Sequence, residues 1–413
     1  MPTMNTPRSP WQSALWVVLM VLVAVPIPFR GLVMPERGAP ILYLIVGAAL
    51  VLFLGVARVS VPFAVLLGYA MAHVLAAGYP IRGVQLLLLM AMCGVLYVEA
   101  AELEARWAER AGWALLAGGT LEGALGVLNL FHIFPSPLAA VLPIRHVGLD
   151  PDAVFRWFNT APWLTLLSRD YLGRTMGWMT HPNYWGSYMA LIVPVAYALL
   201  GRWAGLGAFG LVLLSGSVWP VVSGAVGLMF MAWREVPKVL RPGVVAAVLV
   251  AILAVSVWHI SPRLDPWGDA KHPKPLTMET LTSGRTVVWG EAFEKAKEAP
   301  FLGHGLGSWR MWATEVNRVT KSQRATFQAH NEALQMFFEL GLIGLGIACW
   351  WGLMLAFGVW QDVREWRPAH IMWAGVLIVA IVNSVGSPTF HLPTQAAVAL
   401  FAAARVEGGG RSL

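Results

Sequence analysis

Long apolar runs without an ionisable side chain recur along the 413-residue chain and constrain its fold more than any other feature. Residues 16–25 and 244–257 are two examples. The hydrocarbon core of a bilayer is about 30 Å thick, and about 20 residues of helix cross it. Lipid offers no partner to backbone N–H and C=O groups, so segments that cross it form helices that satisfy those groups internally. The sequence therefore predicts an all-α membrane protein.

The low charge content supports the same fold class. Only 12% of the residues are charged, whereas a soluble globular protein has about 25%. The net charge of +7 is typical of a membrane protein that faces anionic lipids and is compatible with an anionic ligand. No feature indicates nucleic-acid binding. Cys93 and Cys349 lie inside apolar runs, where we expect small buried side chains rather than a disulfide or a metal site.

The whole chain, residues 1–413, is predicted to form a single polytopic membrane domain of about twelve transmembrane helices. Two long segments, 134–183 and 261–332, are predicted to be loops that contain short helices. The expected spans lie near residues 11–29, 39–57, 61–78, 83–100, 112–133, 184–200, 203–217, 219–233, 241–260, 333–360, 369–386 and 392–405.

Basic residues in the short connections predict the orientation, because such residues are enriched on the cytoplasmic side. With both termini in the cytoplasm, the outer short connections hold only Arg30, Arg37 and Arg82. Both long loops then face outward, toward the periplasm if the chain lies in a bacterial inner membrane. The basic residues placed inside are Arg8, Arg58, Arg106, Arg110, Arg202, Arg234, Lys238, Arg241, Arg364, Arg367, Arg405 and Arg411.

The end of the first loop brings polar residues to the outer surface. Residues 173–183 read GRTMGWMTHPN and lead directly into the sixth span. Pro182 fixes the chain before this helix, and Asn183 is a suitable cap. We therefore expect Arg174 near the headgroup zone, where a lipid-borne anion would lie.

A helix is predicted over residues 283–299 of the second loop, with Ser283 as its cap and Pro300 after its end. Arg285 lies in its first turn, beside free backbone N–H groups that suit a phosphate. Pairing of Arg285 with a loop carboxylate explains its position equally well. An apolar stripe along the helix is expected to pack on the membrane domain. The stripe consists of Val288, Trp289, Ala292, Phe293 and Ala296.

Three glycines with G-x-G-x-G spacing, Gly303, Gly305 and Gly307, follow this helix. They do not form a dinucleotide-binding fingerprint, because no strand precedes them and the spacing differs. We expect a turn in which the backbone approaches either another helix or a ligand closely. His304 within the turn is expected to be structural.

His330 directly precedes the tenth span and has Asn331 beside it. An imidazole can accept a proton near neutral pH, so His330 is a candidate general base. A helix cap or an interface residue is the alternative interpretation.

Several polar residues lie within the expected spans. An ionisable group inside a membrane is a functional candidate by default, and Glu122 is the clearest example. Hydrogen bonding between helices is the plainer interpretation. A transporter would also have many spans, but we recognise neither an internal repeat nor paired broken helices. The residues in question are Glu122, Asn129, Glu339 and Asn383.

The second-loop motifs together resemble the core of the bacterial O-antigen ligase and O-antigen polymerase superfamily. The family pattern is an arginine, a tryptophan, P-x-x-G-x-G-x-G and then H-N-x-x-L-Q-x-x-x-E-x-G. A further similarity is an arginine before a P-N step, matched by Arg174 and Pro182-Asn183. The shared core covers residues 174–344. Its matching residues are Arg285, Trp289, Pro300, Gly303, Gly305, Gly307, His330, Asn331, Leu334, Gln335, Glu339 and Gly341.

The resemblance implies an inverting glycosyltransferase that uses neither metal nor cofactor and takes a glycan from undecaprenyl diphosphate in the periplasm. A ligase transfers the glycan to the lipid A-core, a polymerase transfers it to another lipid-linked repeat, and some relatives transfer it to protein hydroxyls. A lipid-glycan transporter is the alternative from another class. Arg174 and Arg285 are implied to bind the diphosphate, and His330 is implied to be the catalytic histidine.

The chain departs from the family at one position. Many members have an arginine after a serine in the span that follows the P-N helix, whereas Gly224 follows Ser223 here. No role of that arginine is transferred to this chain.

Overall fold

A computed structural model of the chain describes residues 61–76, 97, 100, 103, 105–130, 182–243, 245–246, 249–250, 285–320, 329–365, 368–387, 389 and 393–409. All regular elements within these residues are helical. The expected spans near 11–29 and 39–57, and most of those near 83–100 and 241–260, lie outside the described residues. The all-helical fold class is confirmed for the described part of the chain.

Helices lie at eight of the predicted span positions. Two stretches, Ala105–Leu128 and Glu332–Glu365, are long and apolar enough to cross a bilayer, while Arg202–Leu214, Val218–Ala232 and Ala369–Ser384 are shorter apolar helices. The total of twelve spans stays a prediction. The helices are α4 (Val61–Ala76), α6 (Ala105–Leu130), α9 (Pro182–Leu200), α10 (Arg202–Leu214), α11 (Val218–Ala232), α16 (Glu332–Glu365), α17 (Pro368–Ser384) and α18 (Pro393–Gly409).

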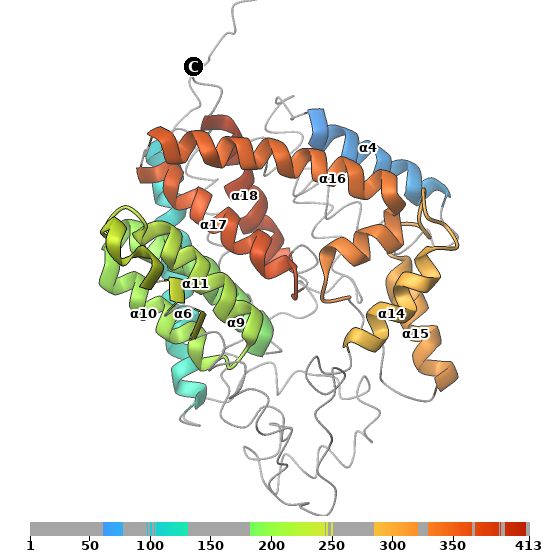
Figure 1. Cartoon of the computed structure of the whole chain (residues 1–413), viewed down its shortest axis with the longest axis horizontal. Helices are drawn as coiled ribbons and strands as arrows, with labels where there is room; N and C mark the ends of the chain where they lie inside the picture. The colour runs from blue at the N-terminus through green and yellow to red at the C-terminus, as the bar shows by residue number, and fades with distance from the viewer. Residues whose placement is uncertain are drawn as a thin grey trace, which may run out of the picture.

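Helix α9 forms the centre of a bundle in which it packs against α6, α10, α11 and α17 (Figure 1). Glycines on α6 allow close approach, as is usual between membrane helices. A Cβ added at Gly126 would lie 2.4 Å from the ring of Trp185, and one at Gly119 would lie 2.6 Å from Ile192. Since later residues of α6 meet earlier residues of α9, the two helices are antiparallel.

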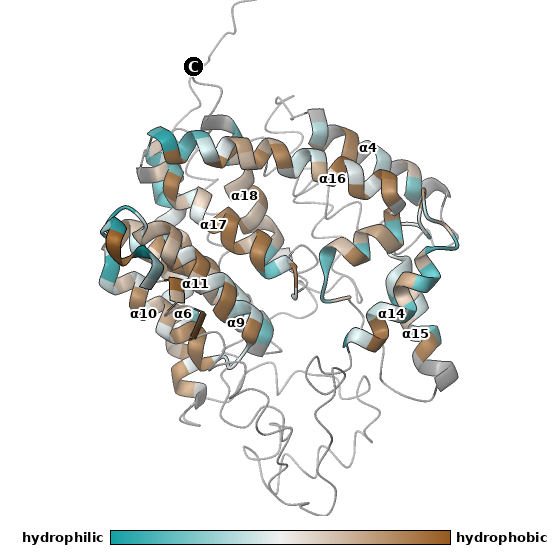
Figure 2. Ribbon diagram, in the orientation of Figure 1, coloured by the Kyte–Doolittle hydropathy of each residue, from teal (hydrophilic) through white to brown (hydrophobic). Residues whose placement is uncertain are grey.

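The described basic residues of the predicted inner connections gather at one end of this bundle. Helix α6 begins there and α9 ends there, and α11 ends there before the short 3₁₀ helix η3 (Lys238–Leu240). Arg234 donates to the carbonyl of Val363 (3.2 Å), and buried Arg405 donates to the carbonyl of Leu103. Hydrophilic residues lie in the connection after α11 and at the end of α16 in Figure 2.

Tryptophans accompany the arginines at this basic end. Arg110 lies over the ring of Trp107 at 4.3 Å, and Arg202 lies over Trp203, which is 73% exposed. Tryptophan with arginine is typical of a membrane–water interface. The basic end therefore has the composition of a headgroup surface.

Helix α16 is broken at Gly341, whose φ of 66° and ψ of −169° are not helical. The part before the break turns sharply away from the longer part (Figure 1). Helices α14 (Arg285–Ala296) and α15 (Ser308–Thr320) pack on the first part through Val288, Trp309 and Phe338. The span expected near 333–360 therefore contains a break at Gly341 that was not predicted from the sequence.

The segment 300–307, which we call the glycine turn, forms hydrogen bonds with the backbone on both sides of the break. The N–H groups of His304 and Gly305 donate to the carbonyls of Phe338 and Glu339 (both 2.9 Å), which the interrupted helix can no longer satisfy. On the other side, the N–H of Leu342 donates to the carbonyl of Pro300 (2.8 Å). Tyr69 of α4 donates its hydroxyl to the carbonyl of Leu340 (3.1 Å). The glycine turn and Tyr69 therefore supply hydrogen bonds that replace those lost at the break.

Replacing Gly341 with alanine should destabilise the protein. The backbone conformation at Gly341 is essentially restricted to glycine and costs a residue with a Cβ about 1–3 kcal/mol. The added Cβ would also lie 2.2 Å from the carbonyl oxygen of Phe301. Gly346→Ala is the matched control, because a Cβ there meets nothing within 4 Å. Thermal unfolding in detergent should show a clear loss for Gly341→Ala only. Equal melting of both variants would contradict this account of the break.

Candidate functional site

Arg285 is the first residue of α14 and connects that helix to the end of α17. Its Nη1 donates to the carbonyl of Gly386 at 2.9 Å. Arg285 thus lies in the first helical turn, as predicted, and this bond is to a backbone carbonyl. Ser283, the predicted cap, lies outside the described residues.

The rest of α14 differs from the prediction in detail. The helix ends at Ala296, and the chain continues through turns to Pro300. Val288, Ala292 and Ala296 of the predicted stripe are buried, whereas Phe293 is 47% exposed. The stripe packs on α15 and the first part of α16.

Trp289 joins the Arg285 face of α14 to the segment that carries His330. Residues four apart share a helix face, and the indole Nε1 of Trp289 donates to the carbonyl of Ala329 at 2.6 Å. His330 is the next residue. One face of α14 therefore contacts the α17–α18 connection at one point and the start of α16 one helical turn later.

His330 is held in an unusual backbone conformation. Its φ is +54°, and it is the one described residue other than glycine with a positive φ. Its neighbours are fixed on both sides: the N–H of Ala329 donates to Oε1 of Gln335 (3.0 Å), and the side chain of Asn331 caps α16 by accepting from the N–H of Leu334 (3.0 Å). His330 as a whole residue is 9% exposed. A strained residue fixed in this way is typical of functional sites.

The three glycines form the backbone turn that was expected, and their partner is a helix. Gly303, Gly305 and Gly307 have φ of 73°, 100° and 82°. The N–H of Gly307 donates to Oε2 of Glu339 at 2.8 Å. A Cβ at Gly303 would lie 2.5 Å from the backbone of Glu339. These motif residues therefore build the joint with α16.

His304 has the contacts of a structural residue. Its Nε2 lies 2.8 Å from the carbonyl oxygen of Lys295, and its ring lies 4.8 Å from that of Phe338. Glu339 is also used in the framework, because its Oε1 accepts from the amide of Gln335 (3.1 Å). Of the two histidines in the motifs, only His330 stands at the strained position.

Asn183 does not cap α9, because that helix already begins at Pro182. Proline is favoured at the first helical position, where its missing N–H costs nothing. Asn183 instead accepts a hydrogen bond from the hydroxyl of Ser217 (2.6 Å), which lies between α10 and α11. Arg174, the other residue expected here, lies outside the described residues.

Two further positions from the sequence lie within the bundle. Glu122 is fully buried on α6, and its backbone carbonyl accepts from the indole of Trp185 (3.2 Å). Gly224, where many family members have arginine, is buried against α10, and a Cβ there would lie 3.2 Å from the ring of Phe209. Glu122 thus lies beside α9 and Gly224 beside α10, within the helix bundle.

A buried polar network at the α17–α18 connection was not recognised as part of the site from sequence. Asn383 accepts from the hydroxyl of Ser187 (3.2 Å) and donates to the hydroxyl of Thr389 (2.9 Å). The hydroxyls of Ser187 and Ser387 are 3.1 Å apart. The available signal was the run NSVGSPT at 383–389 after a long apolar helix.

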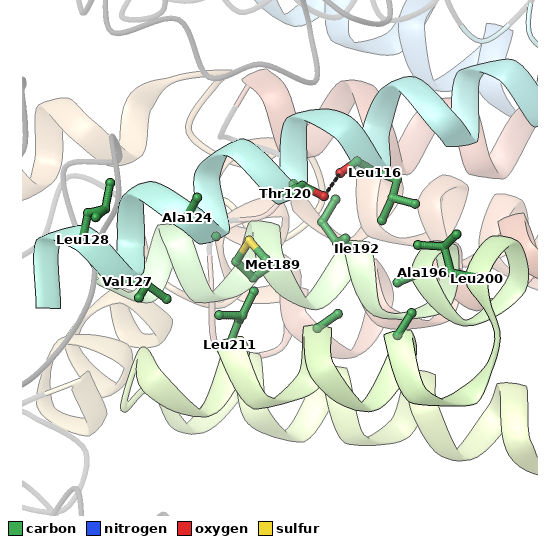
Figure 3. Close-up of a pocket in the computed structure, with 14 residues that line it drawn as sticks. Leu116, Thr120, Ala124, Val127, Leu128, Met189, Ile192, Ala196, Leu200 and Leu211 are labelled. Carbon is green, nitrogen blue, oxygen red and sulfur yellow. Dashed lines mark hydrogen bonds between the residues drawn. The ribbon is translucent and has the colours of Figure 1, made fainter.

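An apolar pocket of about 560 Å³ lies along α6, α9 and α10 (Figure 3). Leu116, Ile192 and Leu211 line it, and the hydroxyl of Thr120 is bonded to the carbonyl of Leu116 at 2.8 Å. No titratable side chain lines this pocket. It is suited to a hydrocarbon chain, and we assign it no chemistry.

Comparison with known families gives the site its context. Residues 203–349 match the model of the family described as O-antigen ligase. The chain contains an O-antigen ligase family domain. Enzymes of this family are membrane transferases of the ligase and polymerase type. No curated protein matches the sequence.

The O-antigen ligase match begins in α10 and ends in α16, so it includes Arg285, the glycine turn and His330. It includes neither Arg174 nor Gly386, the residue that receives Arg285. Within the described residues, no three His, Cys, Asp or Glu side chains are grouped so that they could hold a metal ion.

Proposed function

We propose that the chain is an integral membrane glycosyltransferase of the O-antigen ligase type. It transfers a glycan from undecaprenyl diphosphate to the lipid A-core on the periplasmic side of a bacterial inner membrane. The observation that carries the proposal is the placement of Arg285 and the His330 segment on one face of α14, within the matched domain. All 413 residues are taken as one membrane unit.

The reaction needs a cation for the leaving group and a base for the acceptor. The acceptor oxygen attacks the anomeric carbon, the bond from that carbon to the phosphate oxygen breaks, and inversion follows from a single displacement. Negative charge develops on the departing undecaprenyl diphosphate, where Arg285 and Arg174 stabilise it. Arginine suits this role because it stays charged and binds phosphate through two N–H groups. No metal takes part in this proposal.

His330 accepts the proton of the acceptor hydroxyl in the same step. The strain at His330 is compatible with this role, since the surrounding bonds hold the residue at a fixed place beside α14. Asn331 and the three glycines support it by fixing the start and the break of α16.

We infer that the basic end of the bundle faces the cytoplasm and the site faces the periplasm. The arginine–tryptophan pairs lie at the end where α9 finishes, whereas the Asn183–Ser217 bond lies at the opposite end. A C-terminal reporter that is active only in the cytoplasm should be active on this chain. A periplasmic C-terminus would contradict the orientation.

Reconstitution in proteoliposomes with purified lipid-linked donor and lipid A-core tests the function. The expected result is a lipid A-core that carries the glycan, together with free undecaprenyl diphosphate. Donor that grows longer without lipid A-core would identify a polymerase, and glycan on protein would identify an O-oligosaccharyltransferase. Movement of the donor between leaflets without a new glycosidic bond would indicate a transporter and overturn the proposal.

A further inference from the structure

The connection between α17 and α18 is built around the carbonyl that receives Arg285. Gly386 follows the last residues of α17, and its N–H donates back to the carbonyl of Asn383 (3.2 Å). The N–H of Ser387 also donates to that carbonyl (2.9 Å). The Gly386 carbonyl is therefore presented by a closed turn. We call Asn383, Gly386, Ser387 and Thr389 together the α17–α18 corner.

Hydrogen bonds between buried side chains hold this corner in place. Asn383, Ser187 and Thr389 are each 0% exposed and are joined by hydrogen bonds of 2.9–3.2 Å. Gln395 at the start of α18 donates to the carbonyl of Tyr184 on α9 (2.9 Å). Hydrogen bonds between buried polar side chains favour one arrangement of the residues that they join. The corner is thus tied to α9 as well as to its own helices.

The indole of Trp219 also packs against the corner, at Gly386. A Cβ added at Gly386 would lie 1.8 Å from the indole Nε1 of Trp219, 2.0 Å from its Cδ1 and 2.1 Å from its Cε2. Gly386 does not have a positive φ, so it is the space beneath the indole that requires glycine. Trp219 belongs to the first turn of α11.

We propose that the α17–α18 corner is a positioning element for Arg285. The guanidinium group is planar and rigid, so a bond from one Nη to a fixed carbonyl sets the direction of the whole group. The corner thereby sets the angle at which Arg285 meets an anionic group. This inference depends on the proposed role of Arg285 in binding the diphosphate of the donor.

The test is the pair Gly386→Ala and Gly386→Ala/Trp219→Ala, assayed as full-length protein in proteoliposomes. The alanine methyl forces the corner or the indole to move, and misplacement of a catalytic group by about 1 Å can cost roughly 10²-fold in rate. We expect kcat/KM for the donor to fall by about that factor in Gly386→Ala. Removing the indole restores space, so the double variant should recover most of the loss.

The pattern of the kinetic constants separates positioning from partial unfolding. We expect the KM for the lipid-linked donor to rise while the KM for the acceptor is unchanged, whereas partly unfolded enzyme would lower only the apparent kcat. Ser384→Ala is the matched control, because its hydroxyl donates to the carbonyl of Ile381 within α17 (2.7 Å) and not to the corner. Thr389→Val removes one hydroxyl of the network without changing the size of the side chain. It should raise the KM for the donor in the same way but less, and it replaces Gly386→Ala in the test if that variant does not fold.

Wild-type values of kcat and KM in Gly386→Ala, or in a folded Thr389→Val, would overturn the positioning role. If Arg285→Ala still abolishes transfer, the proposed function stays intact. A loss in Gly386→Ala that Trp219→Ala does not reverse would also overturn the positioning role. Wild-type transfer by Arg285→Ala would instead refute the role of Arg285 itself.

Discussion

Arg285→Lys should lower glycan transfer by about 10²–10³-fold, the usual loss when one donor to a developing negative charge is removed. Lysine keeps the positive charge but has no planar fork, so it cannot bond the Gly386 carbonyl and a phosphate with the same geometry. The substitution therefore tests geometry rather than charge. Arg285→Ala should reduce transfer at least as far.

The measurement is the formation of glycosylated acceptor from purified lipid-linked donor at saturating acceptor. Lys297→Ala is the matched control, because Lys297 follows α14 and its exposed pair with Glu294 (2.6 Å) contributes little to stability. That control should transfer glycan at the wild-type rate. A wild-type rate in Arg285→Lys would show that the fork geometry is not used.

His330→Asn should lower the turnover number by about 10²–10⁴-fold, the contribution of a positioned general base. Asparagine is chosen because it tolerates the left-handed backbone better than alanine, so the fold at residue 330 is preserved. Its amide cannot accept the proton of the acceptor hydroxyl. Thermal unfolding should stay at the wild-type temperature while transfer is lost.

The control is the second histidine of the motifs. His304→Gln can keep a bond to the carbonyl of Lys295, which the imidazole contacts at 2.8 Å. Folded His304→Gln should retain its turnover number even if it unfolds at a lower temperature. The opposite result, with activity lost in His304→Gln and kept in His330→Asn, would reverse the roles assigned to the two histidines.

Much of the helical framework could be predicted from hydropathy, because lipid forces apolar runs into helices. The break at Gly341 could not be predicted in this way. A glycine inside an apolar run is compatible with a straight helix, and here the partners that stabilise the break lie at Pro300–Gly305, about forty residues earlier. The motif spacing indicated a close backbone approach but did not identify α16 as the partner.

The sequence predicted those features of the candidate site that depend on neighbouring residues, such as helix starts. It did not predict contacts between residues far apart in the chain. Arg285 lies in the first turn of a helix that its own segment was predicted to form. Asn183 was assigned as a cap by the same local rules, but its side chain bonds Ser217. Asn383 reads as an ordinary polar residue at the end of a span, and only the folded chain brings Gly386 to Arg285.

The joint between the glycine turn and α16 is made almost entirely of main-chain hydrogen bonds. Such a joint requires glycine where space is lacking or φ is positive, and it requires the Glu339 carboxylate that accepts from Gly307. The glycines are Gly303, Gly305, Gly307 and Gly341. The side chains of Phe301 and Leu302 beside it are 65% and 57% exposed. Evolution is thus free to vary the exposed side chains of this turn without disturbing the main-chain joint that holds the first part of α16 in place.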